Sequence, residues 1–168
     1  MSTNEESLPS GKLMDPNFSH GNMHTMSITD KQSFAEAMIP HHQQALDISE
    51  LAATNTTNPE VLAIADKIIS EQGPEIEKMT PWLNGRSVDY TMMMDGMVSQ
   101  MELNTLRGVR NADFDKLFAQ YMIEHHEGAI SMATQVLSVD DQELTDFASQ
   151  IIEVQTTEIE LLSAIVNG

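Results

Sequence analysis

The sequence predicts an all-α protein, a four-helix bundle built from two copies of one helical hairpin. Apolar residues recur at helical spacing along most of the chain, and no segment shows the alternation of a convincing strand. The pattern of residues 34–46 returns at 118–130, and that of 65–77 returns at 148–160. Each amphipathic hairpin leaves an apolar face that the other can cover. This favours a bundle with pseudo-two-fold symmetry and one long crossover.

The first copy of the hairpin is expected over residues 29–85. Its first helix should begin at Thr29, which fits a capping box with Gln32. The second helix should begin at Asn58-Pro59, where a capping side chain precedes a proline that suits the first helical turn. Asn84-Gly85 should end it, because both residues tolerate the left-handed backbone of a helix terminus.

The second copy should follow a methionine-rich crossover. Residues 92–109 are expected to form a short helix, Asn111 to cap the third long helix, and residues 140–166 to form the fourth. The expected organisation is therefore a flexible His- and Met-containing tail at 1–28, repeat one at 29–85, a Met-rich linker at 86–110 and repeat two at 111–168.

Composition restricts the function. The 168 residues include 26 acidic and 8 basic side chains, which give a net charge of −18. This acidity argues against nucleic acid and anionic membranes as partners, because both attract clustered positive charge. No apolar stretch is long enough for membrane insertion.

Cysteine is absent, whereas 13 residues are methionine. A chain that avoids thiols and collects thioethers suits an oxidising compartment in which soft metal ligands are still wanted. Residues 1–11 lack the basic and apolar regions of a signal peptide, which fits a cytosolic protein or a mature exported one. The composition favours export, and we expect a periplasmic or secreted protein.

Histidines of both hairpins point inward. His41 and His125 share the apolar stripe of their helices, and His42 should lie at the edge of its stripe. Met38 and Met122 precede the two core histidines by one turn, and a thioether beside an imidazole suits Cu(I) or Ag(I). The candidate ligands of the two hairpins are therefore Met38, His41, His42, Met122, His125 and His126. The alternative to metal binding is a purely structural role for these histidines.

Gln72 and Gln155 also lie in apolar stripes, so the core histidines could simply form hydrogen-bonded clamps with these amides. Glu75 and Glu158, three residues further on, could instead orient an imidazole as hydrogen-bond acceptors. No histidine follows a glutamate by three residues, which argues against a di-iron carboxylate site.

Two further groups of candidate ligands lie outside the core stripes. The tail holds His20, Met23, His24 and Met26 within seven residues, and packing explains them poorly. A chance cluster or a cloned tag is the alternative there. The crossover holds Met92, Met93, Met94, Met97 and Met101, and on a helix the last three would share one face. That face is either a thioether cluster for Cu(I) or an apolar surface docked on the bundle.

The repeated motifs resemble a known family. Residues Met38-Ile-Pro-His-His-Gln43 and Met122-Ile-Glu-His-His-Glu127, each followed by Ile-Ile-x-x-Gln-x-x-Glu-Ile, are similar to the family catalogued as domain of unknown function 305. The resemblance covers about residues 30–166. It implies a ferritin-like helical bundle and is strongest to the exported, copper-binding CopM-type members, which by resemblance bind copper and silver and protect the periplasm from excess metal.

The expected function is therefore periplasmic binding of Cu(I) and Cu(II), with Ag(I) as a mimic, for sequestration, resistance or handover. A copper exporter or sensor is the protein partner to expect. We expect no enzyme, because no nucleophile and base are paired in the sequence. The alternatives are a ferritin-like redox enzyme, such as a cuprous oxidase, and a metal-free helical interaction module. One departure from symmetry, Pro40 against Glu124, predicts that the two histidine pairs are not equivalent.

Overall fold

The structure is a computed structural model and describes residues 26–168. It contains helices and no strand over this range, so the all-α prediction is confirmed. The helices are α1 (Lys31–Glu50), α2 (Ala52–Asn55), α3 (Pro59–Met79), the 3-10 helix η1 (Thr80–Leu83), α4 (Gln100–Gly108), α5 (Asn111–Thr134) and α6 (Gln142–Asn167). None of these helices combines the length and apolarity needed to cross a membrane.

Capping side chains define where the long helices of the first hairpin begin. The capping residue of α1 is Asp30, one residue after the predicted Thr29, because the capping box joins Asp30 to Ser33. Helix α3 starts as predicted, with Asn58 accepting a hydrogen bond from the Glu60 amide and Pro59 in the first turn. The helical segment continues through η1 and ends at Asn84-Gly85, where both residues have positive φ.

The second hairpin begins differently from the prediction. The residue before α5 is Arg110, which makes no side-chain cap, and Asn111 is already the first helical residue, at φ 50°. Helix α6 is capped by Asp141, which accepts a hydrogen bond from the Leu144 amide.

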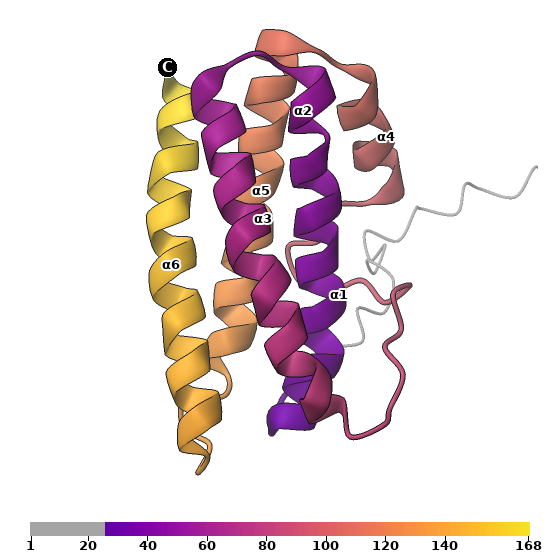
Figure 1. The fold of residues 1–168 in the computed structure, drawn as a ribbon, viewed down its shortest axis with the longest axis vertical. Helices are drawn as coiled ribbons and strands as arrows, with labels where there is room; N and C mark the ends of the chain where they lie inside the picture. Colours follow the sequence, from indigo (N-terminus) through magenta and orange to yellow (C-terminus); the bar gives the residue numbers. More distant parts are fainter. Residues whose placement is uncertain (1–25) are drawn as a thin grey trace, which may run out of the picture.

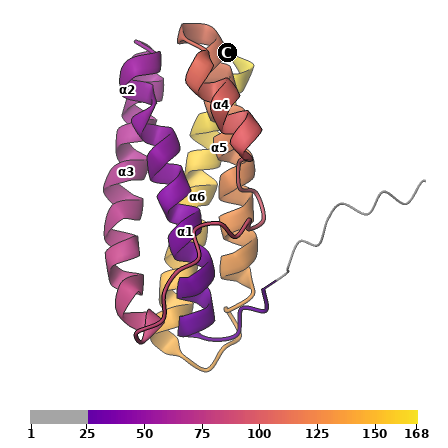
Figure 2. The same ribbon diagram turned by 90° about the vertical axis from the view of Figure 1, so that its right-hand side faces the viewer.

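The four long helices pack as two hairpins (Figure 1). Helix α1 packs mainly on α3, and α5 mainly on α6. The crossover between α3 and α5 runs from one end of the bundle to the other and carries the short helix α4 (Figures 1 and 2). As a result α3 and α5 both run downward in the view of Figure 1, whereas α1 and α6 run upward.

The bundle core consists of two separate apolar clusters. The lower cluster includes Phe34 and Phe147, and the upper cluster includes Phe114 and Phe118. All four long helices contribute to both clusters. Between the clusters each long helix places polar residues, and these form the candidate functional site.

Candidate metal centre

A polar layer crosses the middle of the bundle and separates the two apolar clusters. Its members are His41 and His42 from α1, Gln72 and Glu75 from α3, His125 and His126 from α5, and Gln155 and Glu158 from α6. Every member is at most 9% exposed. Each of the four long helices thus supplies two residues, so the layer follows directly from the duplicated sequence pattern.

Two histidine–glutamate pairs form the outer part of the layer. His42 Nε2 lies 2.7 Å from Glu75 Oε2, and His126 Nε2 lies 2.7 Å from Glu158 Oε2. A carboxylate accepts, so Nε2 carries the hydrogen in each ring, and Nδ1 offers a lone pair when the ring is neutral. Both glutamates therefore orient an imidazole, as the sequence suggested.

One detail of that prediction is wrong. His42 was expected at the edge of its helical stripe, but its side chain is completely buried. Periodicity within α1 alone places His42 at that edge, whereas α3 packs along α1 and covers His42 from the side on which Glu75 lies.

His41 and His125 form the centre of the layer and stack on one another. Their ring centroids are 3.7 Å apart, with the planes inclined by 35°. His41 Nε2 also lies 3.1 Å from the carbonyl oxygen of Asp95 in the crossover, which fixes Nε2–H as the donor. His125 has no hydrogen-bond partner on either ring nitrogen.

Both stacked imidazoles are held neutral. Burial and the neighbouring His42 imidazole lower the pKa of His41 to about 3. Burial, followed by the neighbouring imidazoles, lowers the pKa of His125 well below its usual value. Neutral imidazole is the form that binds a metal ion, so burial keeps these rings competent as ligands at neutral pH.

Nine buried polar atoms of the layer have no hydrogen-bond partner. They are Nδ1 of His41, His42, His125 and His126, Nε2 of His125, and both amide atoms of Gln72 and Gln155. The histidine–glutamine clamp offered by the sequence as an alternative is therefore not formed. Within residues 26–168, however, no three imidazole, thiol or carboxylate side chains are grouped so that they could hold a metal ion. A bound ion would need thioether ligands or a small rotation of the rings.

Two buried thioethers border the layer on opposite sides. Met38 belongs to the lower apolar cluster and Met122 to the upper one, and both are fully buried. This placement follows from topology: α1 and α5 run in opposite directions, so one turn back from each histidine leads to opposite faces of the layer.

A lysine distinguishes the two histidine–glutamate pairs. Lys67 Nζ lies 3.0 Å from Glu158 Oε1, and it also contacts both carboxylate oxygens of Glu71, at 2.7 and 2.8 Å. Burial alone would raise the pKa of Glu158, but its hydrogen bonds with His126, Glu71 and Lys67 lower it overall. Glu75 is hydrogen-bonded to His42 and, within residues 26–168, forms no contact with a lysine or arginine.

The crossover methionines do not share a helical face, contrary to the prediction. Helix α4 begins only at Gln100, so it contains Met101 alone. Met92, Met93, Met94 and Met97 lie in the irregular segment before it. Met94 is buried against the lower cluster, and its amide lies 3.2 Å from the Met97 sulfur. Met101 and Met93 are 79% and 48% exposed.

Backbone packing explains why this segment is not helical. Gly96 has φ 76° and lies against the α5 backbone, where a Cβ would come within 2.2 Å of the Glu124 carbonyl oxygen. A Cβ on Gly128 would come within 1.9 Å of the Asp95 carbonyl oxygen. Gln44 holds the same segment from α1 through two hydrogen bonds with the Val98 backbone. The sequence did not reveal these contacts, nor that of Lys67.

The tail cluster is only partly described. His20, Met23 and His24 lie outside the described residues. Met26 is partly buried against the lower apolar cluster. Its thioether therefore lies at the bundle end and not in the polar layer.

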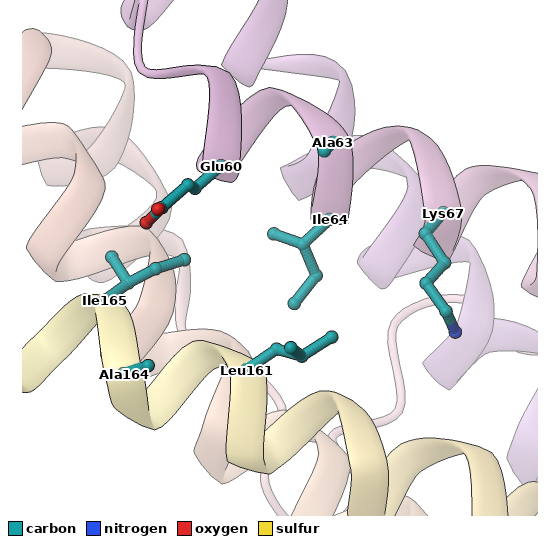
Figure 3. Close-up of a pocket in the computed structure, with 7 residues that line it drawn as sticks. All are labelled: Glu60, Ala63, Ile64, Lys67, Leu161, Ala164 and Ile165. Atoms are coloured by element: carbon teal, nitrogen blue, oxygen red, sulfur yellow. The ribbon is translucent and has the colours of Figure 1, made fainter.

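An apolar groove of about 390 Å³ lies between α3 and α6, beside the upper cluster (Figure 3). Ile64 and Leu161 face each other across it, and Lys67 lies at one end. The groove is relevant to the polar layer only through Lys67, which gives the buried Glu158 a partner that is in contact with solvent.

Known proteins share this architecture. One is CopM in its Cu(II)-bound form, whose sequence is 32% identical to this chain. The two structures superpose with a TM-score of 0.70 over 83% of this chain and 98% of that one. CopM is also known in Cu(I)-bound and Ag-bound forms. A predicted secreted protein from Streptomyces coelicolor is 26% identical, with a TM-score of 0.73 over 81% of this chain and 91% of that one.

Sequence comparisons give one partial relative and one family match. An uncharacterized protein of Acanthamoeba polyphaga mimivirus, L153, is 31% identical over 64 residues, which are 38% of this chain and 42% of that protein. The chain thus spans less than half the length of that relative. Residues 31–166 match the family described as Domain of unknown function (DUF305). This match includes all four long helices and the whole polar layer, and the chain belongs to the DUF305 family.

Proposed function

We propose that this protein binds copper and that the polar layer is an interior copper site. The observation that carries the proposal is the set of buried imidazole Nδ1 atoms that have lone pairs but no partner. A buried polar atom without a partner costs about 1–3 kcal/mol. Four such atoms, three of them on rings whose Nε2–H is already bonded to an oxygen, suit a bound cation. Metal-binding histidines commonly use their second nitrogen in this way.

The ligand chemistry favours copper over harder ions. The available donors are neutral imidazoles and the thioethers of Met38 and Met122, a combination that selects Cu(I) and Ag(I) over Mg(II) or Ca(II). CopM, with a similar fold at 32–33% identity, has been crystallised with Cu(I), Cu(II) and silver. We extend that property to this chain.

Outside the core, we propose that the tail residues His20, Met23, His24 and Met26 and the crossover methionines capture metal. Exposed Met93 and Met101 are accessible for this purpose. The role is sequestration, resistance or handover to a copper exporter or sensor, without catalysis. A periplasmic or secreted location is supported by the absence of cysteine and by the Streptomyces relative, which is itself a predicted secreted protein.

Titration with Cu(I) and Ag(I) under a competing chelator tests the interior site. The double variant His41→Leu/His125→Leu should lose at least one metal equivalent or about tenfold in affinity, because the central lone pairs are gone. Met79→Leu/Met132→Leu is the control, since both residues are buried in the lower cluster away from the layer. Unchanged stoichiometry and affinity in the histidine variant, with helix content preserved, would exclude the interior site.

Deletion of residues 1–25 tests the tail separately. The truncated chain should lose the metal equivalent held by His20, Met23 and His24 while the interior equivalent remains. Equal stoichiometry in both forms would show that the tail is not a site.

A further inference from the structure

A short segment of the crossover closes the polar layer on the side of α1 and α5. This segment, residues 94–98, is called the strap below. It begins with Met94 in the lower apolar cluster and ends with Val98 in the upper one, so it spans the layer that separates the two clusters. Figure 2 shows the crossover passing in front of α1 and reaching α5 near the middle of the bundle.

The strap lies directly against the residues that carry the stacked imidazoles. The carbonyl oxygen of Asp95 lies 3.1 Å from His41 Nε2. Gly96 packs on the α5 backbone at Glu124 and Gly128, within the turn that carries His125. Both stacked rings are completely buried. An ion that approaches them from this side must therefore displace the strap.

The strap is held by contacts that a local motion can break. Gln44 binds the Val98 backbone through two hydrogen bonds, of 2.7 and 2.8 Å. The strap itself is neither helix nor strand, so its backbone lacks the continuous hydrogen bonds of the long helices. Segments of this kind open at a lower free-energy cost than packed helices. Opening the strap would expose the central imidazoles while all four long helices stay folded.

The opposite side of the layer is closed by helices and by buried carboxylates. Glu75 from α3 lines a surface groove together with residues of α6, and it holds His42 at 2.7 Å. Glu158 from α6 holds His126 at the same distance. An ion entering here would have to separate an imidazole from its carboxylate before it reached the central rings. Hydrogen bonds to a charged acceptor are stronger than those between neutral groups, so this side is closed more firmly than the strap side.

The surroundings of the strap attract cations. A cavity of about 390 Å³ lies against the strap at Asp95 and Gly96, and its other lining residues include Glu102, Glu124 and Glu127. Clustered negative charge raises the local concentration of cations. Cations are thus concentrated where the strap would open.

We propose that the strap is the gate through which a metal ion enters and leaves the polar layer. This inference rests on the proposed interior copper site. The contact between Gln44 and Val98 is not part of the layer, so the strap opens against the same restraint whether the layer is empty or filled. Loosening this contact should therefore speed entry and release by the same factor and leave the affinity unchanged, whereas loss of a ligand would change the affinity.

Gln44→Ala in the full-length chain tests the proposal, because it removes both hydrogen bonds with Val98. The ring NMR signals of His41 and His125 report interior Ag(I), first after Ag(I) is added and then after an excess of a competing chelator. We expect entry and release each to be about tenfold faster, because two hydrogen bonds no longer hold the strap closed. The affinity should stay within about twofold of that of the unaltered chain.

Two controls separate strap opening from other effects. Gln43→Ala is the matched control, since the neighbouring amide bonds Asp47 on the exposed face of α1. Ile68→Val removes a buried methylene from the upper cluster on α3 and tests whether a general loss of stability is enough. Neither should change the rates by more than about twofold. If Ile68→Val accelerates exchange as much as Gln44→Ala does, general loosening admits the ion and the gate is refuted.

A measurement without metal tests the same motion. Diethyl pyrocarbonate modifies neutral imidazoles, and peptide mass spectrometry gives the rate at His41 and His125. Gln44→Ala should raise this rate about tenfold at both residues, and Gln43→Ala should not. Gly128→Ala should act in the same direction from the other hairpin, because its methyl group displaces the Asp95 carbonyl. Circular dichroism confirms that each variant is folded.

The outcomes separate the gate from the proposed function. If the unaltered chain binds no Ag(I) in its interior, the proposed function fails and the gate fails with it. If Ag(I) binds but Gln44→Ala changes neither its rates nor the modification of His41 and His125, the strap is not the gate and the interior site stands. A change in affinity at unchanged entry rate would likewise refute the gate.

Discussion

The two hairpins carry nearly the same pattern, yet their polar residues have different partners. In the first hairpin His41 is bonded to the Asp95 carbonyl, and Glu75 is bonded to His42 without a lysine beside it among the described residues. In the second, His125 has no partner, and Glu158 is bonded to Lys67. The repeat thus preserves which residues face inward. The differences come from the crossover, which belongs to neither repeat, and from Lys67, which reaches across from the other hairpin.

A second difference concerns how each hairpin holds the crossover. Gln44 and Gly128 occupy equivalent positions in the two repeats. Gln44 binds the Val98 backbone through both atoms of its amide, whereas Gly128 makes room for the Asp95 carbonyl. One segment is therefore fixed by a polar side chain on one hairpin and by the absence of a side chain on the other.

The largest expected effect concerns the stacked imidazoles that the hairpins share. Between the unfolded pKa of about 6.5 and the folded pKa of about 3, the unfolded chain binds a proton at His41 that the folded chain does not. The free energy of unfolding should therefore fall with acidification, by about 1.4 kcal/mol per pH unit for this imidazole. Chemical denaturation of metal-free protein between pH 7 and 4 measures the slope.

His125 should behave in the same direction, because its pKa is also lowered by burial. Replacing either histidine by leucine should remove about one proton from the linkage. If His41→Leu flattens the pH dependence and His125→Leu leaves it unchanged, the two hairpins do not contribute alike to the stack.

The second largest effect is expected from the two glutamates of the polar layer, whose removal should destabilise the protein unequally. Glu158→Ala removes a partner from both His126 and Lys67 in a fully buried setting, and we expect it to cost about 3–5 kcal/mol of unfolding free energy. Glu75→Ala should cost about 1–3 kcal/mol, because it releases His42 alone and its side chain is 11% exposed. Urea denaturation at pH 7 compares them. Equal losses would mean that Lys67 contributes nothing to the second pair.

The crossover contacts should give a smaller difference. Gly128→Ala places a methyl group against the Asp95 carbonyl and should cost about 3 kcal/mol. Gln44→Ala removes two hydrogen bonds with Val98 and should cost about 1–2 kcal/mol. Thermal denaturation of both variants provides the measurement. An unchanged melting temperature in Gly128→Ala would indicate that the crossover moves away from α5 without cost.

The smallest effect is expected within the crossover itself. Met101→Leu should change stability by less than about 0.5 kcal/mol, because the side chain is largely exposed. Met94→Leu, in the lower cluster, should cost up to about 1.5 kcal/mol. Loss of bound Cu(I) in Met101→Leu at unchanged stability would assign this thioether to metal capture; retention of all the copper would remove it from the candidate ligands.

The fold could be predicted because its determinants are local. Helical periodicity and the repeat identified the four long helices and the inward positions of His41 and His125. The helix caps could be predicted less well, because several polar residues precede α1 and α5, and the choice of Asp30 over Thr29 depends on backbone geometry at a single residue. The prediction for the crossover was wrong because Gly96, at positive φ, packs against α5, and nothing in the nearby sequence reveals that neighbour.

The site could be predicted only in part, for a related reason. The inward histidines and their glutamate partners follow from position on a helix. The contact of His41 with Asp95 joins residues 54 positions apart, and that of Lys67 with Glu158 joins residues 91 apart. Such contacts depend on how hairpins are placed against each other. A surface lysine such as Lys67 resembles any solvated charge in the sequence.

The division of the core by the polar layer also has a consequence for how the native state opens. Each apolar cluster takes residues from all four long helices, so one part of every long helix packs in the lower cluster and another part in the upper one. Native proteins open locally in contiguous units of this kind. Partial opening should therefore separate one end of the bundle from the other and leave both hairpins closed at the opposite end. In native-state hydrogen exchange, the exchange rate of an amide proton would then depend on its position along the bundle axis. Each long helix would contain both a fast-exchanging and a slow-exchanging part.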